Sequence, residues 1–181
     1  MQTHSKLHRF IRELVYAAVC LALCMVLPFL TGQIPEIGGM LCPMHIPVLL
    51  AGFLCGPWWA MGIGFIAPLL RYALFGMPPI LPVGVPMMFE LLTYGLVSAV
   101  LYRLLGKKRG GVYFSLVGAM AAGRIIWGIA AVIVYSAMSA PFTWAIFFAG
   151  AFVNAVPGII LHIILIPALV FALQKAKIIS K

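Results

Sequence analysis

The stretch LVYAAVCLALCMVLPFL, residues 14–30, contains no charged side chain and follows a cationic N-terminal segment. A helix needs about 20 consecutive apolar residues to cross the hydrocarbon core of a bilayer. The stretch and its flanks therefore predict a first transmembrane helix over about residues 10–31. The apolar run continues past Cys24 to Leu30 without a small-x-small cleavage pattern. We expect it to remain as the first helix of the protein and not to be removed as a signal peptide.

The composition of the whole chain agrees with a membrane location. Of the 181 residues, 65% are hydrophobic and only 8% are charged, whereas an average soluble domain carries roughly 25% charged residues. So few charges cannot cover the surface of a water-soluble globule of this length, so we expect the surface to face lipid. The length suits a single domain, residues 1–181.

Apolar runs, separated by Pro, Gly and charged residues, predict six spans. Their approximate ranges are 10–31, 44–56, 58–76, 82–105, 111–138 and 141–174. The second span is bounded by Pro43 and by Gly56-Pro57, and it is too short to cross the membrane unaided. We expect this segment to tilt little, to be broken, or to line a cavity instead of facing lipid.

The net charge of +9 comes from cations that gather at the ends of the predicted spans. They form three clusters: Lys6, Arg9 and Arg12; Arg103, Lys107, Lys108 and Arg109; Lys175, Lys177 and Lys181. Such clusters mark the cytoplasmic side of membrane proteins, and six spans place all three on one side, whereas five or seven would split them. The predicted fold class is therefore an all-α integral membrane protein, a six-transmembrane-helix bundle with cytoplasmic N- and C-termini. The cations also suit contact with anionic lipids, and we expect no nucleic-acid partner.

Two segments fall on the outer side in this topology. They are TGQIPEIGGMLCP, residues 31–43, and GMPPILPVGVP, residues 76–86. Both are rich in Pro and Gly, which favours ordered turns over flexible tethers. Ordered loops at a membrane surface suit a lid over a pocket.

Several polar residues lie within the predicted spans. A charged side chain at mid-membrane costs about 2.5–3.5 kcal/mol, so such residues either pair with one another or face a wet cavity. Glu90 and Tyr94 share a face of the fourth span, and Arg124 and Trp127 share a face of the fifth. If these faces meet, they form an apolar-walled pocket with a few fixed polar groups, open to the outside.

The sixth span carries a further polar stripe. Gly150, Asn154, Gly158 and His162 recur every four residues, which places them on one face of a continuous helix. His45 lies at the outer start of the second span. The predicted substrate-binding residues are Arg124, Glu90, Asn154, Trp127, Tyr94, Arg71, His162 and His45.

Most of these residues also have a structural interpretation. Glu90 either contacts a ligand or pairs with Arg71 or Arg124 to hold the bundle together. Arg71, near the outer end of the third span, either binds a ligand or extends to the membrane interface. Arg124 is too deep for that and favours a cavity. Trp127 is deep enough to stack on a ligand ring.

The two polar residues of the last span leave similar alternatives. Asn154 either contacts a ligand or forms a hydrogen bond between helices. His162 either contacts a ligand or is a core histidine with its own partners.

The sequence gives no support for an intramembrane enzyme. It contains no HExxH, no DxxD-type acidic motif and no Asp, and it has no CxxC pair. We expect no catalytic residue, metal ligand or cofactor. The phosphate-binding motif GxxxxGK[ST] is also missing, so the chain does not bind ATP in that way.

The chain resembles the substrate-binding S-components of energy-coupling factor (ECF) vitamin transporters. The resemblance covers nearly the whole length and rests on size, six spans, topology and the blocks PMHIPVLLAGFLCGP, IAPLLRYALFGMPP and PMMFELLTYG. It also rests on the small-residue step formed by Ala18 and Ala22 in the first span. The resemblance implies that these alanines dock on a transmembrane coupling subunit, which works with two cytoplasmic ATPases. It further implies that the outer halves of the last three helices hold a vitamin, that the subunit topples to release it, and that the protein lies in a bacterial plasma membrane.

The ligand is less constrained by the sequence. Buried arginines favour a carboxylate or phosphate, and the pattern is most similar to the pantothenate-type branch of the family. Other vitamins or precursors stay open, including riboflavin, which would depend more on Trp127 and the tyrosines.

Two other functions also stay open. An assembly protein similar to the MreD cell-shape family would have no ligand, and Arg124 and Glu90 would only pair. A solitary proton-coupled carrier would use Glu90 or His162 as a relay.

Overall fold

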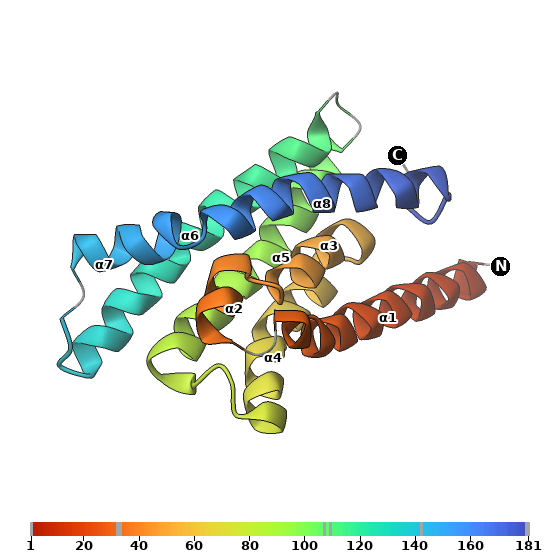
Figure 1. Ribbon diagram of the computed structural model, residues 1–181. Coiled ribbons are helices and arrows are strands. Elements are labelled where there is room, and N and C mark those ends of the chain that lie inside the picture. The colour runs from red at the N-terminus through yellow and green to blue at the C-terminus, as the bar shows by residue number, and fades with distance from the viewer. Residues whose placement is uncertain (1, 32–33, 107, 109, 142, 180–181) are drawn as a thin grey trace.

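The computed structural model describes residues 2–31, 34–106, 108, 110–141 and 143–179 (Figure 1). Lys107, Arg109 and Lys181 of the predicted cationic clusters lie outside the described residues. The described residues form helices and turns and contain no strand. In chain order the elements are α1 (Gln2–Val26), the 3₁₀ segment η1 (Leu27–Thr31), α2 (Pro35–Leu41), α3 (His45–Leu54), α4 (Pro57–Phe75), the π-type turn η2 (Ile80–Gly84), α5 (Val85–Leu105), α6 (Gly111–Ala137), α7 (Trp144–Phe148), the π-type turn η3 (Ala149–Val153) and α8 (Val156–Lys175).

The predicted all-α bundle with six spans is confirmed. Six helical segments are long and apolar enough to cross a membrane: Lys6–Thr31, Ile37–Leu54, Pro57–Phe75, Ile80–Leu105, Gly111–Ala137 and Val156–Lys175. Figure 1 shows both termini on the right of the bundle, while the turn between α6 and α7 lies on the left. The cytoplasmic position of the termini stays a prediction.

The second span is broken into two helices. Cys42 ends α2 in the left-handed conformation, with φ 47°, and its N–H donates to the carbonyl of Gly38. Pro43 follows and has no N–H to donate to a continuing helix. The chain restarts as α3, in which residues 45–53 are all buried, against α1, α4, α5 and α8. Because α3 is enclosed by other helices, its short length does not expose its ends to lipid.

Glycines let α4 and α5 approach closely. A Cβ on Gly64 of α4 would overlap the carbonyl of Leu91 on α5, and a Cβ on Gly95 of α5 would overlap the carbonyl of Ala60 on α4. Close approach through small residues is a usual way to join helices in lipid, where the hydrophobic effect does not drive association. This contact fixes the rotation of α5, which carries Glu90 and Tyr94.

We expect Gly64→Ala to destabilise the protein by about 1–3 kcal/mol, because the two backbones must move apart. Gly62→Ala, two residues away on the same helix, is the matched control, since a Cβ there has no neighbour within 4 Å. Alanine favours helix over glycine by about 1 kcal/mol, so Gly62→Ala should keep or raise the melting temperature in detergent. Equal melting temperatures for the two variants would contradict the close contact.

The predicted sixth span, 141–174, is wrong as a single helix. The chain forms α7, then η3, and only then the long helix α8. The hydroxyl of Thr143 caps α7 by accepting from the N–H of Ile146 at 3.3 Å. Pro157 lies in the first turn of α8, and a proline disfavours helical conformation in the residue before it. The stripe from Gly150 to His162 is therefore not one helix face, and only Gly158 and His162 share α8.

Candidate functional site

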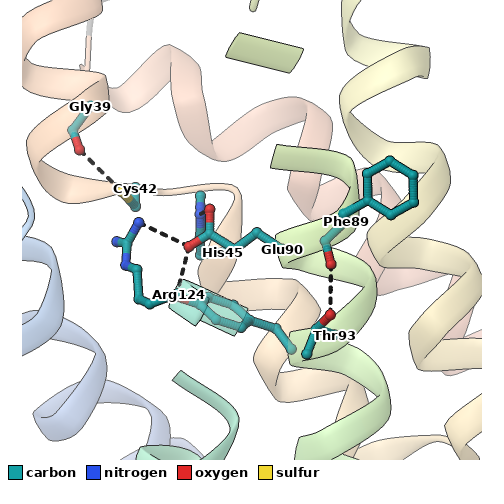
Figure 2. A network of polar contacts seen from close by, with 8 residues as sticks. Gly39, Cys42, His45, Phe89, Glu90, Thr93 and Arg124 are labelled. Carbon is teal, nitrogen blue, oxygen red and sulfur yellow. Dashed lines mark hydrogen bonds and ion pairs between the residues drawn. The ribbon is translucent and has the colours of Figure 1, made fainter. Parts of the chain in front are cut away.

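A buried ion pair joins the fourth and fifth spans. Nη1 of Arg124 on α6 lies 2.9 Å from Oε1 of Glu90 on α5, and only 2% of the Glu90 side chain is exposed. Tyr94, one helical turn along α5, donates its hydroxyl to the same Oε1 at 2.9 Å. Figure 2 shows Arg124 and Glu90 pointing toward each other between the helices. One carboxylate oxygen thus holds both a guanidinium and a phenol.

Two buried histidines adjoin the pair. His45 is the first residue of α3, and its Nε2 lies 3.6 Å from Oε2 of Glu90, just beyond hydrogen-bond range. Its ring centroid is 5.6 Å from that of Tyr94, at a steep angle. The ring of His162 on α8 lies nearly parallel to that of His45, with centroids 6.2 Å apart. We call these five side chains, Arg124, Glu90, Tyr94, His45 and His162, the polar cluster.

The break between α2 and α3 lies beside the polar cluster. Cys42 is next to the guanidinium of Arg124, and its thiol donates to the carbonyl of Gly39 at 3.1 Å (Figure 2). The end of α2 rests on α8, because a Cβ on Gly158 would lie 2.6 Å from the carbonyl oxygen of Met40. Gly158 is one turn from His162, so α2 packs against the helix that supplies this histidine. The predicted outer segment 31–43 is therefore partly helical.

The polar cluster leaves hydrogen-bonding capacity unused. Four buried nitrogens have no hydrogen-bond partner within the described part of the chain: Nδ1 and Nε2 of His45, Nε of Arg124 and Nε2 of His162. Buried polar atoms in folded proteins are nearly always satisfied, and a buried donor without a partner costs about 1–3 kcal/mol. A group that supplies the missing partners would remove this cost. No set of three His, Cys, Asp or Glu side chains among the described residues is arranged to hold a metal ion.

Sequence reasoning missed two contributors. Gly123 of α6 makes room for Tyr94, since a Cβ there would overlap the tyrosine ring, and Tyr94 could not then reach Glu90 in its present position. Cys42 was not considered for the site. Its place directly before Pro43 and three residues before His45 was the available signal.

Arg71 is placed differently from the polar cluster. It is 4% exposed, and its Nη1 donates to the carbonyl of Met25 at 2.7 Å, near the end of α1. Its guanidinium lies over the rings of Phe29 and Phe75, at 5.3 and 5.2 Å from their centroids. Burial rules out extension to solvent, and of the two predicted partners for Glu90, the structure has Arg124. A ligand role for Arg71 stays a prediction, while its contacts tie α4 to the end of α1.

We expect Arg71→Gln to lower the melting temperature without changing ligand affinity. A hydrogen bond from a charged group contributes about 1.5–3 kcal/mol, and the ring contacts add to it. Arg9→Gln is a control, because the Arg9–Glu13 pair is exposed at Arg9 and such pairs contribute little. The measurements are a thermal melt and a binding titration. A large loss of affinity in folded Arg71→Gln would return Arg71 to the binding residues.

Asn154 and Trp127 also lie apart from the polar cluster's contacts. Asn154 is exposed in the turn between η3 and α8. Trp127 is half-buried, its ring centroid is 6.0 Å from that of Phe147 on α7, and a Cβ on Gly150 would lie 2.9 Å from its ring. Trp127 therefore packs toward α7 and η3. Ligand contacts by these two residues stay predictions.

An apolar groove of about 390 Å³ lies between α6 and α7. Its lining includes Ile125, Ile129 and Trp144, all exposed on the surface, and Thr143 is the one lining residue with a polar side chain. A small-molecule site usually adds a few fixed polar groups to its apolar walls. The groove offers few of these and opens on the face that we expect to meet acyl chains, so the polar cluster is the stronger candidate.

The predicted docking alanines lie on the open face of α1. Ala18 and Ala22 are both exposed, whereas Ala17, Cys20 and Cys24 face the core. The structure therefore leaves the small-residue step free to contact another helix. Its role in docking stays a prediction.

Comparison with known proteins bears on the function of this bundle. Residues 12–170 match the family of substrate-specific components of ECF transporters. No curated protein and no solved structure matches the chain. Members of this family are binding subunits for transport and not enzymes. With the match covering most of the length and six apolar helices to place it in a membrane, the chain belongs to the substrate-specific components of ECF transporters.

Proposed function

We propose that the protein is the high-affinity binding subunit for uptake of a small vitamin or vitamin precursor, and that the polar cluster is its binding site. The observation that carries the proposal is the set of unpartnered nitrogens of His45, Arg124 and His162 around a buried carboxylate. A purely structural ion pair does not explain why neighbouring histidines are buried without partners.

The cluster has the features of a small-molecule site. Its side chains come from α3, α5, α6 and α8, so binding a ligand would join four helices. Apolar helices surround it, and the break at Cys42 lies beside it. We propose that α2 covers the bound ligand.

Delivery depends on partner proteins in this proposal. The exposed step of Ala18 and Ala22 docks on a transmembrane coupling subunit, and two cytoplasmic ATPases supply the energy. The membrane is the bacterial plasma membrane. The chain's missing ATP-binding motif fits this division of labour.

The sequence predicts a carboxylate-bearing vitamin, with pantothenate first. That prediction took the buried arginines to be available for an anion. In the structure Glu90 and the Met25 carbonyl already contact them. Pantothenate is therefore the first compound to test and not an assumption of the proposal.

The test is to identify the small molecule that co-purifies with the protein by mass spectrometry and to measure thermal shifts across a vitamin panel. A co-purified vitamin, or a saturable shift of several degrees, supports the proposal. Neither result would favour an assembly protein of the MreD type. Proton-dependent uptake by the chain without coupling subunits would instead favour a solitary carrier.

A further inference from the structure

We infer that the polar cluster takes an uncharged part of the ligand, one with both a hydrogen-bond donor and an acceptor, such as an amide, a lactam-like ring edge or a hydroxyl. Glu90 is then the residue that selects against anions. This inference rests on the proposed function, because it treats the polar cluster as the binding site.

The first step concerns the charge of the cluster. Glu90 and Arg124 are in contact and cancel one another, and the histidines are uncharged in the formal count at pH 7. Arg71, the other arginine within a span, is directed at the carbonyl of Met25. A carboxylate entering the cluster would bring an unbalanced negative charge beside Glu90. Burying a charge without a counter-charge is costly, so the cluster disfavours an anionic ligand.

The second step concerns the free hydrogen-bonding positions. Oε1 of Glu90 already accepts from Arg124 and Tyr94, while the nearest polar neighbour recorded for Oε2 is Nε2 of His45 at 3.6 Å. Oε2 therefore keeps capacity to accept a hydrogen bond. Nε of Arg124 is a free donor. A carboxylate or phosphate offers acceptors only and cannot satisfy Oε2, whereas an amide or hydroxyl serves both positions.

The third step concerns shape. The rings of His45 and His162 are nearly parallel, and Tyr94 meets His45 edge-on. Flat ring faces next to paired polar atoms suit a planar amide or the edge of a heterocycle. Charge, hydrogen bonding and shape thus point to the same class of ligand group.

The test compares matched compounds that differ only in charge: pantothenate with panthenol, nicotinate with nicotinamide, and biotin with its amide. We expect the uncharged member of any pair that binds to be favoured by about tenfold or more in calorimetric titration. An anionic member favoured by that factor would overturn the inference and leave the proposed function intact. Where no pair binds, the co-purified ligand decides, because a carboxylate or phosphate buried in the cluster also overturns it. If nothing binds or co-purifies, the proposed function fails and this inference with it.

Glu90→Gln tests the assignment to one residue. The variant leaves Arg124 without its counter-charge, so the anionic member of each pair should gain about tenfold or more relative to its partner. Glu13→Gln is the matched control, since Glu13 pairs with Arg9 on α1, outside the cluster, and should not change the ratio. An unchanged ratio in folded Glu90→Gln would overturn the role of Glu90. Should Glu90→Gln not fold, the wild-type comparison still decides the inference.

Discussion

Arg124→Ala is expected to abolish ligand binding and to lower the melting temperature at the same time. Arg124 Nε is a free donor in the polar cluster, so its loss removes a ligand contact. The substitution also leaves Glu90, 2% exposed, without its counter-charge. Breaking one side of a buried ion pair costs about 3–5 kcal/mol. From the sequence alone we expected the variant to lose binding with its fold intact, and the ion pair adds the cost in stability.

The double variant Glu90→Gln with Arg124→Gln separates the two effects. It removes both charges, and replacement of a buried pair by uncharged groups is often nearly neutral for stability. We expect its melting temperature to recover most of the loss, while binding stays at least about a hundredfold weaker, about 2.7 kcal/mol. Thermal melts and titrations in detergent measure both quantities. Wild-type affinity in folded Arg124→Ala would remove Arg124 from the site.

The spans were predictable where strong breakers bound them. The third and fifth spans, predicted at 58–76 and 111–138, are found as Pro57–Phe75 and Gly111–Ala137. Gly56-Pro57 and Gly110-Gly111 mark their starts in the sequence. The region from 141 to 155 was not predictable in this way, because apolar composition does not distinguish an α-helix from π-type turns. Pro157 signalled the boundary, but its neighbours are as apolar as the helix.

The site was predictable as a set of residues but not as a set of contacts. The cost of burying Glu90 and Arg124 marked both as paired or cavity-facing, whatever the helix rotations. The choice of Arg124 over Arg71 as partner depends on how α4, α5 and α6 pack. Glycines such as Gly64 and Gly123 set that packing, and their contacts lie on other helices. A single sequence does not contain that information.

The charge of the site illustrates the consequence. Two buried arginines taken singly favour an anionic ligand, and this is what the sequence predicted. Taken with their partners, Glu90 and the carbonyl of Met25, they no longer do. The ligand class depends on the sum of charges within the cluster, which requires the contacts and not only the residues.

Ala18→Trp is expected to reduce uptake to background while ligand affinity stays within about threefold of wild type. Ala18 and Ala22 are exposed one turn apart on α1, and Ala17 on the adjoining face is buried. Small residues let two helices approach closely in lipid, and an indole at position 18 would hold a docking helix away. The side chain would extend from the bundle, so the polar cluster is not disturbed. Uptake is measured in cells that contain the coupling subunits, and binding on the purified chain.

The control for this variant is another exposed apolar residue given the same bulk. Ile133 on α6 is 64% exposed, and Ile133→Trp should leave both uptake and binding near wild type. If both tryptophan variants lose uptake, the effect is general crowding in the membrane and not a docking face on α1. Loss of binding in Ala18→Trp would indicate misfolding. Normal uptake in Ala18→Trp would mean that the coupling subunit meets a different face, because a close helix contact cannot accept a tryptophan in place of an alanine.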